Sequence, residues 1–381
     1  MAQPICPYFG KCGGCSTQHI DYALQLENKK KMLGHAVRCN DINNIKVFSG
    51  NPYAYRNRMD FIFHSSGLGL RKNRKWGEMV DIEECAISNK RLNMLLKEAR
   101  EFFKKDGNID HFDIKKSTGT FRYAVIRAPQ HGSSVSFVLN PESPRIKEAC
   151  EKIKKFAETA SAANVLITYV PPGTDMSISD DFFAVKGKDT LKEKYIGHDF
   201  EYSSQGFFQN NPEMAEKMQE YCNGLLKKYG VEKTKKAHLL DLYGGVGTFG
   251  IINADLFSGV TIVENVKQCI DAAGRNIEIN GIKNAKAVLL DAVQLRKLSL
   301  PKPLFVITDP PRSGMDPKTI RQLNELKPEV IIYISCNLEQ LEKDIPKFRG
   351  YLIKSAALFD LFPQTNHAEG VVEMILDKSS I

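Results

Sequence analysis

The second half of the chain alternates apolar runs with helical patterns, and this alternation constrains the fold more than any other feature. From about Gln209, the runs HLLDL, VTIVE, AKAVLL, LFVIT and VIIYIS each have the composition of a buried strand. A glycine-rich turn, YGGVGTFG, follows the first run. Strand and helix in alternation are typical of a doubly wound sheet with helices on both faces. We therefore predict an α/β domain over residues 196–381.

The first half has a different pattern. Between about Asn51 and Lys186, short alternating apolar runs such as DFIFH, YAVIRA and SSVSFVL are broken by Gly, Pro, Asn and Ser, which indicates strands. Helical patterns lie among them, at 88–105 and 143–160. We predict an α+β, β-rich domain over residues 1–195, with a helix near 21–37 that could instead pack on the second domain.

Composition excludes several classes of protein. The 381 residues are 42% hydrophobic and 26% charged, which is ordinary for a globular chain. The amino terminus lacks a basic and then apolar signal pattern, and no apolar run has the length of a membrane span. We expect a cytoplasmic, monomeric protein without a membrane partner. The net charge of +8 suits a polyanionic partner such as nucleic acid, although scattered lysines also occur on ordinary surfaces.

Three cysteines crowd the amino terminus in the spacing C-x5-C-x2-C, at Cys6, Cys12 and Cys15. Glycines beside them allow the backbone to wrap closely around a bound group. A tetrahedral site needs a fourth ligand: His19 would complete a zinc site, and Cys85 would complete an all-thiolate set suited to an iron–sulfur cluster. The spacing leaves zinc and iron open. It differs from the C-x3-C-x2-C of radical-SAM enzymes.

Several predicted strands are followed by a side chain that could bind a ligand or take part in a reaction. Glu264, Asp291 and Asp309 each follow a strand, and the first can hold the two hydroxyls of a ribose. A glycine turn alone would equally suit a dinucleotide, but this series of acidic strand ends is the usual layout of S-adenosylmethionine (SAM) methyltransferases. Cys336 lies between a strand and a helix that starts near Asn337, where a thiolate is favoured. A buried, inert cysteine is the alternative.

Five motifs together carry a resemblance to a known family. FFQNN, DLYGGVGTF, DPPRSG, ISCN and FPQTNHAEG occur in this order between Phe207 and Gly370. With the amino-terminal cysteines, the chain resembles the SAM-dependent, iron–sulfur-containing RNA uracil-5-methyltransferases from Cys6 to Glu373. That family commonly has a cysteine at the position of Gly244 and an asparagine at that of Thr248.

The resemblance implies a site and its cofactors. Cys336 would add to carbon 6 of uracil, and Glu369 would remove the proton from carbon 5. His367 has no assigned role: the family suggests a supporting one, and an ordinary loop histidine fits equally. The residues that would line the SAM pocket are Gln209, Tyr243, Thr248, Glu264, Asp291 and Asp309. Those that would hold a [4Fe-4S] cluster, for which we expect a structural role, are Cys6, Cys12, Cys15 and Cys85.

The expected substrate is a structured RNA with a flipped uridine, because the target base must leave its stack to reach Cys336. Ribosomal (23S) RNA and the transfer-RNA T-loop both fit. The β-rich half carries plausible phosphate contacts, or simply a basic face, in Arg56, Arg58, Arg71, Lys72 and Arg74.

Two other functions remain open at this point. An amino-methyltransferase acting on adenine or cytosine would use DPPR without needing Cys336. A non-catalytic RNA-binding protein would keep the cysteine cluster and the basic surface. The presence of both Cys336 and Glu369 argues against each of them.

Overall fold

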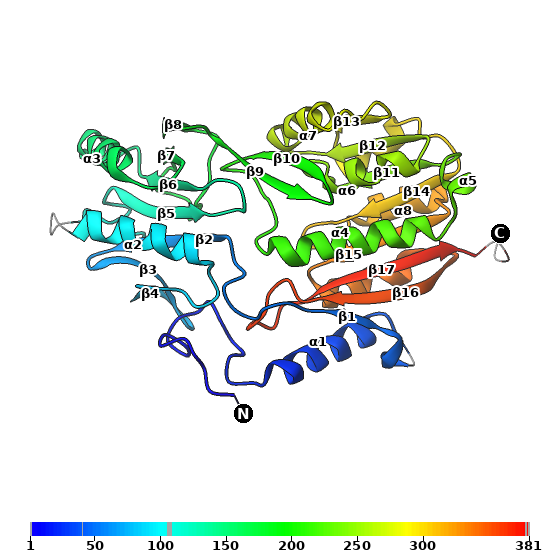
Figure 1. The fold of residues 1–381 in the computed structure, drawn as a ribbon, viewed down its shortest axis with the longest axis horizontal. Coiled ribbons are helices and arrows are strands. Elements are labelled where there is room, and N and C mark those ends of the chain that lie inside the picture. The colour runs from blue at the N-terminus through cyan, green and yellow to red at the C-terminus, as the bar shows by residue number, and fades with distance from the viewer. Residues whose placement is uncertain (1, 40, 105–108, 378, 380–381) are drawn as a thin grey trace. The chain divides into compact units, whose positions relative to one another are not determined.

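The computed structural model describes residues 2–39, 41–104, 109–377 and 379. The chain divides into two compact units, each built from three segments (Figure 1). Unit 1 comprises Met1–Tyr22, Asn51–Glu193 and Tyr202–Pro212, and unit 2 comprises Ala23–Gly50, Lys194–Glu201 and Glu213–Ile381. Two of the crossings between the units occur within a hairpin of β9 (Thr190–Tyr195) and β10 (His198–Ser203).

Unit 1 is an α+β unit around a seven-stranded sheet of order β4-β3-β2-β5-β6-β7-β8. Neighbouring strands are antiparallel except for β6 and β7, which are parallel. The strands are β2 (Arg58–His64), β3 (Gly67–Lys72), β4 (Lys75–Asp81), β5 (Phe121–Arg127), β6 (Ser134–Leu139), β7 (Asn164–Tyr169) and β8 (Phe182–Lys186). The helices are α2 (Lys90–Lys104) and α3 (Ile146–Thr159).

The core of unit 1 forms where α2 and α3 pack on this sheet. In α2 the buried residues Leu92, Leu95, Leu96, Ala99 and Phe103 recur at helical spacing, so they form one apolar stripe. The Phe103 ring lies 5.1 Å from that of Phe63 and 5.2 Å from that of Phe137, centroid to centroid. Aromatic contacts between helix and sheet thus fix the sheet on which the amino-terminal cysteines later pack.

Unit 2 contains an eight-stranded sheet of order β1-β16-β17-β15-β14-β11-β12-β13. Its strands are β1 (Lys46–Phe48), β11 (His238–Leu242), β12 (Gly259–Glu264), β13 (Ala285–Leu289), β14 (Leu304–Thr308), β15 (Val330–Ser335), β16 (Tyr351–Phe359) and β17 (Glu369–Leu376). Its helices are α1 (Tyr22–Ala36), α4 (Pro212–Lys227), α5 (Val231–Thr234), α6 (Thr248–Ile252), α7 (Lys267–Ile279), α8 (Pro317–Leu326) and α9 (Leu338–Asp344). Short 3-10 turns are η1 (Ile42–Asn44), η2 (Ala254–Leu256), η3 (Ala292–Lys297) and η4 (Ile345–Lys347).

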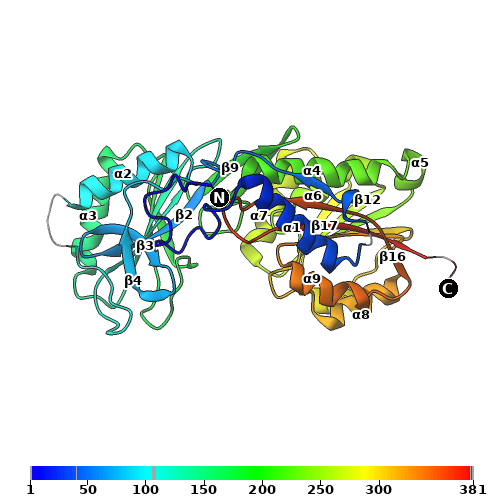
Figure 2. The same cartoon turned by 90° about the horizontal axis from the view of Figure 1, so that it is seen from below.

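The predicted strand–helix alternation gives a mostly parallel, doubly wound sheet. From β11 the chain builds outward through β12 and β13, then returns to place β14 and β15 on the other side. Figure 2 shows α4 and α6 on one face of this sheet and α1, α8 and α9 on the other. The strand order reverses between β11 and β14, and ligands bind at the carboxyl ends of strands at such a switch point.

One strand runs against the others, and another comes from a distant part of the chain. β17 is antiparallel and lies between β15 and β16. Consequently its first residue lies at the same edge as the carboxyl ends of the parallel strands. β1 comes from the amino-terminal part of the chain and pairs in parallel with β16, where the Phe48 and Phe359 rings stack at 4.4 Å. Within the described residues, no helix combines the length and the apolarity needed to cross a membrane.

Candidate active site and cysteine cavity

Cys336 and Glu369 meet at the ligand-binding edge of the sheet of unit 2. Cys336 directly follows β15, and Glu369 is the first residue of the neighbouring β17. The antiparallel register pairs Ser335 with Gly370, so the next pair outward is Cys336 and Glu369. Directly opposed residues have Cβ atoms about 5 Å apart in such a pair. The two predicted catalytic residues are thus close neighbours despite their separation in sequence.

Asp309 and Arg312 complete this group of four. Asp309 follows β14, the strand beside β15, and Arg312 lies in the loop after it. Arg312 hydrogen-bonds to the Cys336 thiol, and its charge acts on both Cys336 and Glu369. The site therefore combines one thiol, two carboxyl groups and one permanent cation.

Burial dominates the protonation of these groups. It raises the pKa of Cys336 to about 11, and the negative charges of Glu369 and Asp309 act in the same direction, while Arg312 opposes them. Burial also raises the pKa of Asp309 to about 7 and that of Glu369 well above its ordinary value. In the free protein at neutral pH the thiol therefore holds its proton, and burial favours the protonated form of the Glu369 carboxyl. Arg312 is the group here that favours a thiolate.

The loop that carries Arg312 is fixed against α9. Asn337 Nδ2 donates to the carbonyl oxygen of Arg312 at 2.9 Å. Gly314 has a φ of +79°, and an added Cβ there would lie 2.4 Å from Asp344 Oδ2. That carboxylate in turn accepts from the backbone N–H of Met315 at 3.0 Å. Only glycine fits this close approach, which holds the DPPRSG loop beside the strand end of Cys336.

Replacing Arg312 with glutamine is expected to raise the pKa of the Cys336 thiol further, because a cation and hydrogen-bond donor that stabilises the thiolate is lost. Below its pKa, a thiol loses about tenfold in thiolate population for each unit by which the pKa rises. The rate at which iodoacetamide labels Cys336, followed by mass spectrometry of its peptide, should therefore fall in Arg312→Gln. Arg321→Gln, on the exposed face of α8, is the matched control and should label at the wild-type rate. Equal rates in both variants would contradict the assignment.

The predicted cofactor contacts in unit 2 follow the adjacent strands. Glu264, at the end of β12, accepts backbone hydrogen bonds from Gly245 at 3.2 Å and from Val266 at 2.9 Å, which fix its carboxylate beside the glycine turn. Asp291 follows β13 and is exposed, and its side chain accepts from the backbone N–H of Val293 at 3.0 Å.

Two further predicted cofactor contacts, besides Asp309, lie in the turn after the first parallel strand. Tyr243 directly follows β11 and has a φ of +61°, a conformation that few non-glycine residues adopt. Thr248 opens α6 and accepts a hydrogen bond from Gln219 of α4 at 3.1 Å. Tyr243, Glu264 and Asp291 thus follow successive strands from β11 to β13, and Thr248 opens the helix after the first of them.

Asp241 is a buried carboxyl group of this turn to which sequence reasoning gave no role. It lies inside β11 and accepts from the backbone N–H of Gly250 at 2.7 Å. Burial raises its pKa to about 7, opposed by that hydrogen bond, and the charges of Asp309 and Glu264 raise it further. An acidic residue within the otherwise apolar strand HLLDL is the signal that could have identified it.

The structure gives a steric reason for the glycine at 244. A Cβ there would lie 2.6 Å from Ile262 Cγ2, and one at Gly250 would lie 2.7 Å from Ile262 Cγ1. Real Cβ atoms do not approach so closely, so a cysteine at 244 would require Ile262 to shift. In this chain, the glycine at 244 is therefore required by the bulk of Ile262 on β12.

Of the other residues named from the sequence, Gln209 belongs to unit 1 and His367 is exposed to solvent. Gln209 belongs to unit 1, whereas the other predicted cofactor contacts belong to unit 2. Its carbonyl oxygen accepts from Asn57 Nδ2 at 3.5 Å, and Asn57 N donates to the next carbonyl along at 2.9 Å. His367 is exposed, its backbone N–H donates to Thr365 Oγ1 at 3.2 Å, and its ring lies edge-on to Phe362.

The four predicted ligand cysteines line one cavity in unit 1. An isolated β-bridge pairs Cys12 with Lys72 of β3, and Cys85 lies in the segment after β4. Apolar side chains, among them Met59 and Ile82, form much of the remaining wall. His19, the alternative fourth ligand, is exposed and packs on Phe9, with ring centroids 5.5 Å apart. The fold thus brings Cys85 to the other three cysteines.

Burial and the neighbouring cysteines both affect the pKa of Cys12 and of Cys15. Burial raises the pKa of Cys12 and of Cys15 to about 11 each, with smaller contributions from the charges of Cys85 and Cys6. The backbone N–H of Gly14 donates to Cys12 Sγ at 3.3 Å. Within the described residues, no three or more His, Cys, Asp or Glu side chains converge as ligands of a single metal ion.

The predicted phosphate contacts of unit 1 are largely engaged within the protein. Arg58 pairs with Asp60 at 2.9 Å, and Lys72 pairs with Glu78 at 2.6 Å. Arg71 pairs with Asp175 at 2.7 Å and stacks its guanidinium 4.0 Å above the Trp76 ring. The other two residues are Arg56, whose Nε donates to the carbonyl oxygen of Arg58, and Arg74, which has a φ of +57°.

The chain is similar to proteins that are described as methyltransferases of RNA or tRNA. The family model described as tRNA (uracil-5-)-methyltransferase matches residues 21–378. A tRNA (uracil(54)-C(5))-methyltransferase of Pyrococcus abyssi is 32% identical, with 98% of this chain and 86% of that protein covered. An uncharacterized RNA methyltransferase of Caldanaerobacter subterraneus subsp. tengcongensis is 30% identical, over 98% of this chain and 84% of that protein.

A solved structure matches the fold over nearly the whole chain. It is the crystal structure of the Pyrococcus abyssi tRNA (uracil-54, C5)-methyltransferase in complex with S-adenosyl-L-homocysteine. The TM-score is 0.78 at 29% sequence identity, and the match covers 95% of this chain and 86% of that one. The chain therefore has a mixed α/β methyltransferase fold.

Proposed function

The chain belongs to the tRNA (uracil-5-)-methyltransferase family and is a SAM-dependent RNA (uracil-5-)-methyltransferase, and on this premise we propose that its substrate is uridine 54 of tRNA, methylated through a covalent adduct. The observation that carries the mechanism is the pairing of Cys336 with Glu369 at one edge of the sheet. The substrate is supported by relatives of similar length that are named for that nucleotide.

The reaction needs a nucleophile because carbon 5 of uracil reacts poorly with an electrophile. When bound, SAM supplies an electrophilic methyl group. The thiolate of Cys336 adds to carbon 6 and pushes electrons into the ring, so that carbon 5 becomes nucleophilic and takes the methyl group. Arg312 favours the thiolate, since it contacts the sulfur and carries a permanent positive charge.

Release of the product needs a base. After methyl transfer, carbon 5 holds both a methyl group and a proton, and the carbon–sulfur bond breaks only when that proton leaves. Glu369 is directly opposite Cys336 in the register, and its burial increases its affinity for a proton once it is ionised. We assign it the proton transfer from carbon 5.

The strand ends of unit 2 would hold SAM. Glu264, fixed by backbone N–H groups, would take the ribose hydroxyls, and the exposed Asp291 would lie near the adenine. Tyr243, Thr248 and Asp309 would line the rest. The relative crystallised with S-adenosyl-L-homocysteine supports a SAM-type ligand for this fold.

Labelled SAM and RNA that lacks the modification test the substrate. The protein should transfer label to tRNA, and nuclease mapping should place 5-methyluridine at position 54. Label in 23S rRNA instead would refute the tRNA assignment while keeping the reaction. Label on an adenine or cytosine amino group would refute uracil methylation itself, and transfer to no RNA would favour a binding protein without turnover.

We also propose that Cys6, Cys12, Cys15 and Cys85 hold a [4Fe-4S] cluster. A cubane cluster binds one thiolate at each iron, so its ligands surround a cavity and do not meet at one point. The residues fit this arrangement: four cysteines line one apolar-walled cavity, and a backbone N–H already points to Cys12 Sγ. When bound, the cluster would stabilise the packing of residues 6–15 on unit 1.

Anaerobically purified protein is expected to be brown and to contain about four iron and four sulfide per chain, as a cubane cluster requires. Cys85→Ser should lower the iron content as much as Cys12→Ser, because either change removes the thiolate of one iron. Cys150→Ser, on α3 outside the cavity, is the matched control and should keep it. Colourless protein with stoichiometric zinc would contradict the cluster.

A further inference from the structure

Two polar side chains on one face of α1 are buried. Gln25 and Lys29 are each 3% exposed and lie four residues apart, so both point to the same side of the helix. Burying a lysine is costly unless its charge is paired and its protons are bonded. The structure therefore contains a specific set of partners for this pair.

Those partners lie in the segment that leads to Glu369. Lys29 Nζ donates to Asp360 Oδ1 at 2.6 Å and to the carbonyl oxygen of Phe362 at 3.1 Å. Gln25 Nε2 donates to Gln364 Oε1 at 3.1 Å. Asp360 is fully buried, and Gln364 has a φ of +67°, which a non-glycine residue keeps only where its surroundings determine it. Residues 360–364 are thus held from α1 by both of its buried polar side chains.

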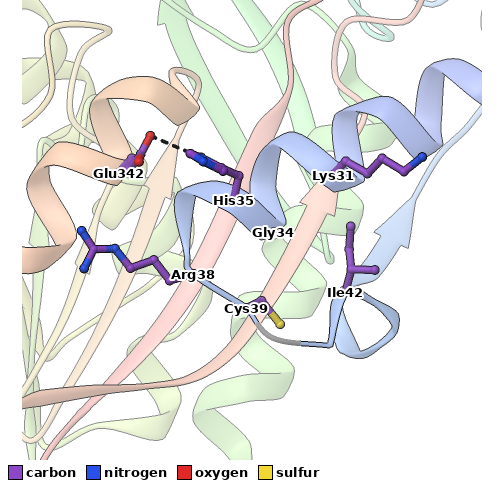
Figure 3. A pocket seen from close by; sticks show the side chains of 7 residues that line it. All are labelled: Lys31, Gly34, His35, Arg38, Cys39, Ile42 and Glu342. Atoms are coloured by element: carbon purple, nitrogen blue, oxygen red, sulfur yellow. Dashed lines mark ion pairs between the residues drawn. The ribbon is translucent and has the colours of Figure 1, made fainter.

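Helix α1 also packs near α9, the helix that follows Cys336. An added Cβ at Gly370, next to Glu369, would lie 2.9 Å from Leu33 Cδ1 of α1 and 3.0 Å from Leu338 of α9, so α1, α9 and β17 are in tight contact there. Figure 3 shows His35 of α1 facing Glu342 of α9 across a surface pocket, with a 3.6 Å contact between His35 Nδ1 and Glu342 Oε2. α1 therefore touches the segment before Glu369 and the helix after Cys336.

We propose that α1 positions the proton acceptor, with Lys29 as the principal positioning residue and Gln25 assisting it. Neither side chain contacts the reacting atoms in this assignment. They hold residues 360–368 in the backbone conformation that places Glu369 opposite Cys336. The kinetic consequence rests on the function proposed above for Glu369; the structural consequence, an ordered segment, does not.

The kinetic test is Lys29→Met, which keeps the aliphatic stem and removes the ammonium group. A misplaced Glu369 slows the release step, so kcat should fall by on the order of 100-fold, the effect of a small misplacement at a reacting centre, with KM for RNA and SAM nearly unchanged. The variant should also accumulate a covalent protein–RNA complex. Tyr229→Phe is the matched control: it removes a 2.7 Å hydrogen bond to Glu373, a buried carboxylate on the same strand, and should accumulate none.

Hydrogen exchange supplies a readout that does not depend on catalysis. Peptides that cover residues 360–369 should exchange faster in Lys29→Met than in wild type, and peptides from β11 to β14 should not change. Unchanged exchange would refute the positioning role whatever the kinetics. If Glu369→Gln traps an adduct while Lys29→Met turns over normally, the positioning role fails and the proposed function stands. If Glu369→Gln traps none, the role of Glu369 fails, and faster exchange in Lys29→Met still supports α1 as the element that orders the segment.

Discussion

Replacing Cys336 with alanine is expected to abolish methylation of RNA, because in the proposed mechanism the adduct at carbon 6 is what makes carbon 5 reactive. Removing a catalytic nucleophile costs on the order of 10⁶-fold in kcat. SAM affinity should stay close to that of wild type, since the proposed cofactor contacts lie at the other strand ends. Transfer of label from SAM to RNA, with SAM binding measured by calorimetry, checks both halves of this expectation.

The control for this experiment is another thiol of the chain. Cys150 lies on α3, with Sγ 3.4 Å from Tyr169 OH, and Cys150→Ala should methylate normally. A tRNA with 5-fluorouridine at position 54 should trap the wild-type protein as a methylated adduct, because fluorine does not leave as a proton does. Normal turnover by Cys336→Ala would remove the covalent mechanism from consideration.

Replacing Glu369 with glutamine is expected to stop the reaction after methyl transfer. Glutamine keeps the size and the hydrogen-bonding reach of the side chain but is not a proton acceptor of useful strength. The variant should therefore accumulate a covalent complex with ordinary uridine, seen as a slow band on a denaturing gel. Multiple turnover should be lost, while the first methyl transfer remains.

The pH dependence of that trapped complex has a defined sign. Glu369→Gln removes a carboxylate that raises the pKa of Cys336, yet burial still holds this pKa above its ordinary value. Formation of the adduct should therefore speed up as the pH rises through the neutral and mildly alkaline range. A rate that falls with rising pH would show that a protonated group limits the step instead.

Two controls separate base catalysis from positioning. The double variant Cys336→Ala/Glu369→Gln should give no slow band. Glu373→Gln changes a second buried carboxylate on β17, one that bonds Tyr229 and Ser355 away from the strand end, and should turn over without an adduct. Wild-type turnover by Glu369→Gln would move the proton-acceptor role to another group, and Asp309 is the next candidate at this edge.

The sequence predicted the strand ends well because that information is local. A buried apolar run followed by Glu264, Asp309 or Cys336 is visible in a few residues, and parallel strands bring their carboxyl ends to one edge. Glu369 needed the family motif. Its strand starts at that edge only because β17 runs antiparallel between β15 and β16, which no local pattern indicates.

Other parts of the site depend on contacts that are distant in sequence. Lys29 and Asp360 are 331 residues apart, and each looks like an ordinary surface residue in its own segment. The spacing of Cys6, Cys12 and Cys15 could not choose between His19 and Cys85. The sheet of unit 1 carries Cys85 back to the amino-terminal segment, so Cys85, and not His19, lines the cavity with the other three cysteines.

The insertion of β17 between β15 and β16 also bears on how the chain is synthesised. On a ribosome, β1 emerges long before its partner in the sheet, residues 357–359 of β16. The gap between β15 and β16 closes only after Glu369 and the rest of β17 have emerged. Because the sheet is incomplete until β17 joins it, the two residues of the proposed mechanism come together only at that late stage of folding. An unfinished chain would thus contain the thiol without the carboxyl group that faces it.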